Sequence, residues 1–193
     1  MKLAYTIFAL VLSALVFAAE PSPAATEEEA WRALGETGTF AAIRHALAPG
    51  TGDPEDFKLG DCATQRNLSE AGRDQARRIG AALRARGIRF DKVLTSEWCR
   101  CRETAALLDA GPIEAFDALN STYHSPAAAD ERTARVKRRM RAEAAEAKIL
   151  LSTHQFNIRA LTGSGTRSGE LLVLRLDAAG EPRILGSIAI PAE

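Results

Sequence analysis

Short apolar runs that alternate with amphipathic segments constrain the fold of this 193-residue chain more than any other feature. Runs with the composition of buried strands cover residues 39–44, 90–96, 113–119 and 148–153. Segments with the helical spacing of apolar residues lie between them. Strands that alternate with helices indicate a mostly parallel sheet with helices on both faces. The sequence therefore predicts a three-layer α/β/α sandwich.

Capping residues mark where the helices begin. Thr26 and Glu29 have the spacing of a capping box, which predicts a short helix through residue 34. Ser69 is a good N-cap for a long helix to about residue 86. A further helix is expected to start near residue 97 and run to 108, and Ser125 with Pro126 predicts another that runs to about 147. Residues 169–177 and 182–190 are expected to form a C-terminal β-hairpin.

The N-terminus has the layout of a secretory signal peptide. Lys2 supplies a positive charge, residues 3–19 are almost wholly apolar, and a polar segment with two prolines follows. We expect cleavage near Ala18 or Ala19, with an uncleaved membrane anchor as the alternative. The predicted organisation is a signal peptide over 1–19, a linker and short helix over 20–37, and a single domain over 38–193. The expected location is periplasmic or secreted.

The charge balance bears on which partners the chain can have. Lys plus Arg and Asp plus Glu both number 25, so the formal net charge is zero. A neutral chain lacks the general basic field with which many proteins bind nucleic acid, so no nucleic-acid partner is expected. One stretch, residues 135–141, is strongly basic. We interpret it as a solvated helix face. The functional alternative is weak association with an anionic membrane surface.

Export makes a disulfide plausible for the three cysteines. Cys99 and Cys101 are too close in sequence to pair comfortably, so Cys62 is expected to pair with one of them. The C-x-C spacing without a nearby histidine does not fit a zinc site. We therefore expect no metal and no cofactor.

Cationic and imidazole side chains follow three of the predicted strands. Arg44 and His45 end the first, Arg100 follows the second, and His154 follows a later one. Arg66 precedes the first long helix. Ligands of open α/β sheets bind beyond the carboxyl ends of the strands, and arginine forks match the oxygens of phosphate. These residues together predict a binding site for a phosphate group.

Four motifs, in order, resemble those of the histidine phosphatase superfamily, the phosphoglycerate-mutase-like group, and in particular its small single-domain exported members. The first is the Arg44-His45 pair, and the second is the R-x-L-S-x-x-G segment over 66–72. The third is an S-x-x-x-R-x-x-x-T-A segment over 96–105, and the fourth is the strand that ends at His154. The resemblance covers residues 42–158.

The resemblance implies a role for each matched residue. His45 would be the nucleophile that takes the phosphoryl group and forms a phosphohistidine. Arg44, Arg66 and Arg100 would bind the phosphoryl oxygens, with His154 as a further donor. It also suggests that a Cys62–Cys99 bridge ties two arginine-bearing loops together, with Cys62–Cys101 as the rival pairing.

The family's proton donor is the part of the pattern that this chain departs from. Many members carry Glu or Asp after the third strand, where this chain has Asn120, and another branch has Asp after the second histidine, where this chain has Gln155. The remaining candidates for the acid are side chains in loops, namely Asp53, Glu55, Asp56, Asp117 and His124. A leaving group that is already a weak base would need no strong acid.

The function expected from these observations is that of an exported phosphomonoesterase that works through a phosphohistidine. A small phosphorylated substrate is expected as its partner, and sugar phosphates of the cell envelope suit the expected location. The alternative is a phosphate- or phosphosugar-binding protein of the envelope that has the pocket without turnover.

Overall fold

The computed structural model describes residues 25–123, 125–143 and 147–192. The predicted signal peptide, most of the predicted linker and the candidate His124 lie outside the described residues. Within them, no helix combines the length and apolar character needed to cross a membrane.

A six-stranded sheet in the order β3-β2-β4-β1-β5-β6 forms the middle layer. Its strands are β1 (Phe40–Arg44), β2 (Lys92–Thr95), β3 (Ile113–Ala115), β4 (Ile149–Thr153), β5 (Leu171–Leu176) and β6 (Pro182–Ile188). The first four run parallel, β5 pairs antiparallel with β1, and β5 and β6 form the predicted C-terminal hairpin. The mostly parallel sheet and the hairpin are confirmed.

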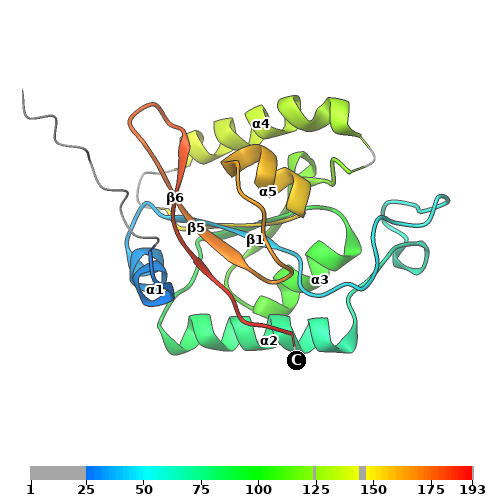
Figure 1. The fold of residues 1–193 in the computed structure, drawn as a ribbon, viewed down its shortest axis with the longest axis horizontal. Helices are drawn as coiled ribbons and strands as arrows, with labels where there is room; N and C mark the ends of the chain where they lie inside the picture. The colour runs from blue at the N-terminus through cyan, green and yellow to red at the C-terminus, as the bar shows by residue number, and fades with distance from the viewer. Residues whose placement is uncertain (1–24, 124, 144–146, 193) are drawn as a thin grey trace, which may run out of the picture.

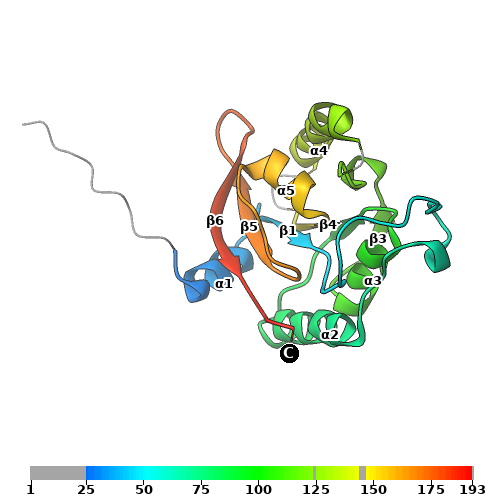
Figure 2. The ribbon, with the colours of Figure 1, turned by 45° about the vertical axis from the view of Figure 1, so that its right-hand side comes forward.

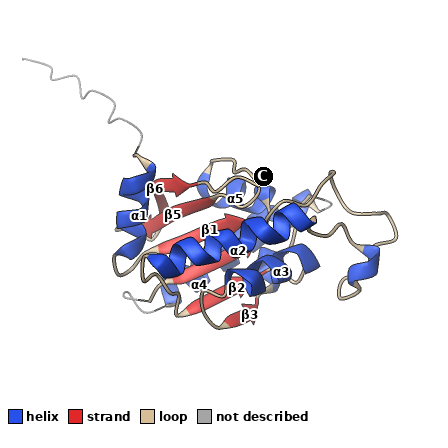
Figure 3. Cartoon of the chain, turned by 90° about the horizontal axis from the view of Figure 1, so that it is seen from below, coloured by secondary structure: helices blue, strands red, loops and turns tan. Residues whose placement is uncertain are grey.

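Helices cover both faces of this sheet (Figure 1). On one face lie α1 (Glu27–Gly35), α2 (Glu70–Ala85) and α3 (Cys99–Leu108), and on the other α4 (Ala129–Ala142) and α5 (Gln155–Thr162). Viewed from below, α2 lies in front of the strands (Figure 3). Consecutive residues of the central strands point to opposite faces, so that Ala41 and Ile43 join the first core and Phe40 and Ala42 the second. The three-layer sandwich is therefore confirmed.

Two of the predicted helix starts follow the expected chemistry. Thr26 and Glu29 form the reciprocal capping box, and the Ser69 hydroxyl accepts the Gly72 N–H. Gly72 and Gly80 let α2 approach its neighbours, because a Cβ at either position would lie within 2.2 Å of a backbone oxygen. Small residues on one face of this helix therefore serve close packing.

The bounds of two predicted elements were wrong, and one helix was missed. The strand expected over 113–119 ends at Ala115, where its partner strand also ends, and residues 117–119 form a 3₁₀ turn instead. Pro126 opens a 3₁₀ turn, the Ser125 side chain caps nothing, and α4 ends at Ala142. Helix α5 was not predicted, because eight residues show too little periodicity.

Candidate active site

The candidate site lies where three neighbouring parallel strands end. Strand β4 lies between β1 and β2, and the register pairs Arg44 with Thr153 and Thr95 with Ser152. The residues that follow, His45, Ser96 and His154, therefore meet at one edge of the sheet. The long loop from β1 to α2 extends beyond that edge (Figure 2). The sheet topology thus brings distant parts of the sequence to one place.

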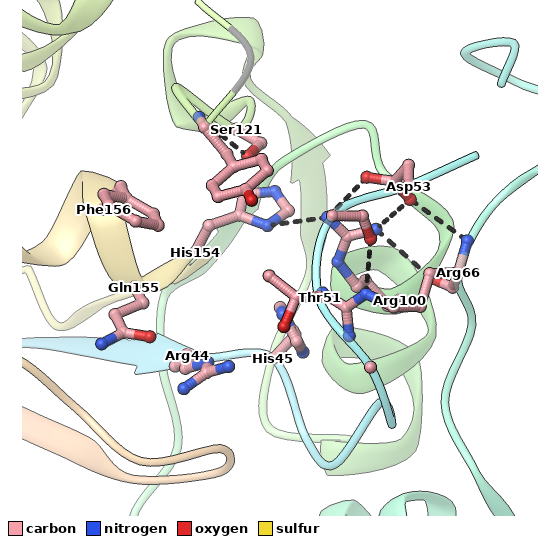
Figure 4. Close-up of a pocket in the computed structure, with 13 residues that line it drawn as sticks. Arg44, His45, Thr51, Asp53, Arg66, Arg100, Ser121, His154, Gln155 and Phe156 are labelled. Atoms are coloured by element: carbon pink, nitrogen blue, oxygen red, sulfur yellow. Dashed lines mark hydrogen bonds and ion pairs between the residues drawn. The ribbon is translucent and has the colours of Figure 1, made fainter. Parts of the chain in front are cut away.

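A cavity of ≈110 Å³ opens at this edge (Figure 4). It is lined by the five predicted residues Arg44, His45, Arg66, Arg100 and His154. Sequence reasoning did not assign the rest of its lining to the site, apart from the acid candidate Asp53: Gly50, Thr51, Gly52, Ser121, Tyr123, Gln155 and Phe156. These residues come from loops and from α5, whose positions only the folded chain reveals.

His45 is buried and presents a neutral imidazole. Its Nδ1 lies 2.8 Å from the Ala46 carbonyl oxygen. Since a carbonyl only accepts, Nδ1 carries the proton and Nε2 keeps a lone pair. Burial lowers the pKa of His45 to about 3, against the Ala46 hydrogen bond and with the help of the nearby Arg100, Arg44 and Arg66 charges. An uncharged Nε2 is the form that can attack phosphorus.

Three arginines surround this imidazole. Burial and the charge of Arg100 lower the pKa values of Arg44 and Arg66. The Nε–H groups of Arg44 and Arg100 are both buried, and neither has a hydrogen-bond partner among the described residues. The Arg66 guanidinium donates to the Gly52 and Ala48 carbonyl oxygens and so also braces the loop after β1. The clustered positive charge of these side chains favours an anion in this cavity.

Asp53 is the centre of a hydrogen-bond network on one side of the cavity. Its Oδ1 accepts from Arg100 Nη1 at 2.7 Å and from the Arg66 N–H at 3.1 Å. Its Oδ2 accepts from Arg100 Nη2 and from Trp98 Nε1, both at 3.1 Å. Burial raises the pKa of Asp53, but the hydrogen bonds and charge of Arg100 outweigh it and hold the pKa below its usual value. An ionised Asp53 orients Arg100 and has no proton to donate.

A hydrogen bond to Ser96 holds the His154 ring in place. The two lie 2.9 Å apart at Nε2 and Oγ, and Ser96 Oγ lies 3.2 Å from Asn120 Oδ1. The Asn120 amide oxygen only accepts, so the Ser96 hydroxyl donates to it and must accept from His154 Nε2–H. The other ring nitrogen, Nδ1, lies 3.4 Å from Arg100 Nη2. Burial, followed by the charges of His45 and the arginines, holds the pKa of His154 well below its usual value.

The cysteines pair as the resemblance suggested. Cys62 and Cys99 form a disulfide, which links the loop before Arg66 to the start of the helix that carries Arg100. The rival Cys62–Cys101 pairing is thereby excluded. Cys101 is free and buried, with Sγ 3.4 Å from His154 Nε2, and burial raises the pKa of its thiol to about 12.

The other candidate acids lie outside the cavity. Glu55 and Asp56 are both exposed, and neither lines it. Asp117 pairs with Arg135 of α4 at 2.6 Å, because the chain turns into a 3₁₀ segment there and faces that helix. Among the described residues, no three or more His, Cys, Asp or Glu side chains are grouped as metal ligands.

A family comparison identifies this strand-edge arrangement. Residues 43–123 match the model of the histidine phosphatase superfamily, branch 1. Over this stretch the chain is similar to the histidine phosphatase domain. The matched stretch contains Arg44, His45, Arg66 and Arg100, and the superfamily is one of metal-independent phosphatases. His154 lies beyond the matched stretch and reaches the same cavity through the fold.

A short stretch of the chain also matches an individual phosphatase. A broad-specificity phosphatase of Saccharomyces cerevisiae is 48% identical over 42 residues, which is 22% of this chain and 18% of that protein. The match therefore spans less than a fifth of the yeast relative's length.

Solved structures show the same fold. The structure of the protein histidine phosphatase SixA with tungstate aligns with a TM-score of 0.56 at 15% identity, over 78% of this chain and 96% of that one. A phosphoserine phosphatase of Entamoeba histolytica in complex with 3-phosphoglyceric acid aligns at 0.57 and 12%, over 80% and 98%. These alignments show that the chain shares the fold of both structures.

Proposed function

We propose that this protein is a metal-independent phosphomonoesterase that transfers the phosphoryl group to His45. One observation carries the proposal: the side chains of Arg44, Arg66 and Arg100 line the same cavity as a neutral His45. A phosphoryl group is the ligand that would pair with these cations and meet a nucleophile. Small phosphate esters are its substrate class.

The reaction follows from these groups. The Nε2 lone pair of His45 forms a bond to phosphorus while the ester P–O bond breaks and the leaving oxygen departs with that electron pair. Arg44 and Arg100 stabilise the charge on the phosphoryl oxygens, with Arg66 nearby. Water then attacks phosphorus, the P–N bond breaks, inorganic phosphate leaves, and the imidazole returns to its neutral form.

The leaving group is expected to need little help from an acid. Of the described residues that line the cavity, Asp53 carries the one carboxyl group, and it is ionised and bonded to Arg100. Proton transfer to the leaving oxygen then falls to water. This favours esters whose alcohol is a weak base.

Export and an envelope substrate are part of the proposal. The apolar N-terminal segment supports a periplasmic or secreted location, and the Cys62–Cys99 disulfide is consistent with an oxidising compartment. Envelope sugar phosphates suit that location. Weak membrane association through α4 has less support, because Arg135, Lys137, Arg139 and Arg141 all form ion pairs with acidic side chains.

Hydrolysis of p-nitrophenyl phosphate, with and without EDTA, tests the proposal. We expect turnover that resists EDTA and falls at least about 10³-fold in His45→Ala. Asp56→Asn, an exposed position outside the cavity, serves as the matched control and is expected to retain activity. Inorganic phosphate that binds without any turnover would instead support the non-catalytic binding protein. Activity retained in His45→Ala would overturn the assigned nucleophile.

A further inference from the structure

The cavity is large enough for a phosphoryl group and little more. Its volume of ≈110 Å³ is well below the roughly 300–1,000 Å³ of pockets that enclose a whole drug-sized ligand. The charged residues that would bind phosphate surround His45. If the phosphoryl group occupies this cavity, the rest of the substrate must lie at the mouth, against whatever side chains the mouth presents.

Two aromatic side chains form one wall of that mouth. Tyr123 and Phe156 both line the cavity and are 40% and 49% exposed. Their ring centroids lie 5.4 Å apart with the planes inclined by 51°. Figure 4 shows Phe156 across the cavity from Asp53 and Arg66. The wall is therefore an exposed apolar surface directly beside a strongly polar site.

The two rings come from different segments of the chain. Tyr123 follows the 3₁₀ turn at 117–119, and Phe156 lies in the first turn of α5. Single exposed apolar residues are ordinary, but paired rings that share a cavity with a buried nucleophile form a continuous surface. Small residues line the cavity too, namely Gly50, Thr51 and Gly52. They leave room for a flat group against the aromatic wall.

We infer that the leaving group of the substrate carries a ring with an apolar face, which packs against Phe156 and Tyr123. This inference rests on the proposed function and specifies its substrate class. Aryl rings and the C–H faces of sugars share the chemistry that recognises an aromatic wall. Short acyclic alcohols such as glycerol cannot cover it.

Specificity constants for three esters test the inference: 1-naphthyl phosphate, glucose 6-phosphate and glycerol 2-phosphate. Each variant is compared with the wild type on the same ester, which cancels differences in intrinsic reactivity. In Phe156→Ala, kcat/KM is expected to fall about 5- to 10-fold for the ester whose ring packs against the wall. For glycerol 2-phosphate it is expected to fall less than about 2-fold. Tyr123→Ala is expected to show the same selectivity. If 1-naphthyl phosphate loses more than glucose 6-phosphate, the substrate is an aryl ester; the reverse order identifies a sugar phosphate.

Two controls separate this effect from general damage. Ile184→Ala removes another exposed apolar side chain, outside this cavity, and is expected to leave all three constants unchanged. Phe156→Leu keeps an apolar side chain without the ring and is expected to give an intermediate loss. The inhibition constant of inorganic phosphate should stay the same in every variant, because phosphate does not reach the aromatic wall.

Three outcomes would overturn the inference. Equal losses on all three esters would mean that Phe156 acts on the phosphoryl site itself. Unchanged constants in Phe156→Ala and Tyr123→Ala would mean that the wall serves another partner. Wild-type protein that hydrolyses none of the esters would refute the proposed function together with this inference. Failure of the inference alone leaves the wild-type protein active, so the two failures can be told apart.

Discussion

At the scale of single residues, the main feature of the cavity is the ion pair between Asp53 and Arg100. Asp53 and Arg100 are both 2% exposed and bonded through two N–H···O contacts. The pair uses both terminal nitrogens of the guanidinium and leaves its Nε–H without a partner. Asp53 therefore fixes the orientation of the Arg100 guanidinium beside the cavity.

Replacing that carboxylate is expected to harm both binding and stability. Asp53→Asn removes the negative charge opposite three arginines, and breaking a buried pair by removing one partner typically costs about 3–5 kcal/mol. We expect kcat/KM for p-nitrophenyl phosphate to fall by roughly 10- to 100-fold as Arg100 loses its orientation. Urea unfolding and steady-state kinetics measure the two effects.

The control for this prediction lies three residues further along the same loop. Asp56 is exposed and does not line the cavity, so Asp56→Asn should change neither quantity. A fully active, fully stable Asp53→Asn protein would show that Arg100 does not need this partner.

At the scale of elements, the approach of α2 to α3 depends on a missing side chain. A Cβ at Gly80 would lie 2.2 Å from the Leu108 carbonyl oxygen at the end of α3. The equivalent position at Gly72 faces the Leu47 backbone, two residues after His45. These contacts connect the packing of one helix with the position of the catalytic loop.

Gly80→Ala is expected to destabilise the protein even though alanine favours a helix. Alanine gains about 1 kcal/mol in helix propensity, whereas forcing α2 away from α3 costs more, for a net loss of about 1–3 kcal/mol. Gly35→Ala, at the end of α1 with nothing within 4 Å, is the matched control and should be close to neutral. Urea unfolding compares the two, and a more stable Gly80→Ala protein would contradict the packing.

At the scale of the whole molecule, two buried neutral histidines link folding to pH. The pKa of His45 is lowered to about 3 and that of His154 well below its usual value, chiefly by burial. An unfolded histidine titrates near 6.5, so below that pH the unfolded chain takes up protons that the folded protein refuses. This contribution to stability is present in full above pH 6.5 and is lost as the pH falls toward 3.

We therefore expect the free energy of unfolding to fall as the pH drops from 7 to 4.5. Each histidine contributes up to about 1.4 kcal/mol per pH unit in this range. His45→Gln removes one of the two titrations and should flatten the slope by about half. Urea unfolding at a series of pH values measures it, and a wild-type stability that is flat over this range would contradict buried neutral histidines.

The sequence by itself determined the layers of the fold and five of the residues that line the cavity. Strand and helix patterns are local, and parallel strands bring their carboxyl ends together, so Arg44, His45, Arg100 and His154 could be placed without coordinates. The caps Thr26 and Ser69 marked the starts of α1 and α2 for the same reason. The histidine phosphatase resemblance depended on these local motifs.

Only the tertiary structure decided how these groups are used. The Asp53–Arg100 pair joins residues 47 apart, and the Ser96–His154 contact joins residues 58 apart. The choice of Cys99 over Cys101, the helix α5 and the Tyr123–Phe156 wall likewise depend on which segments meet. Such contacts follow from packing and from the pairing of buried polar groups, which no local periodicity encodes.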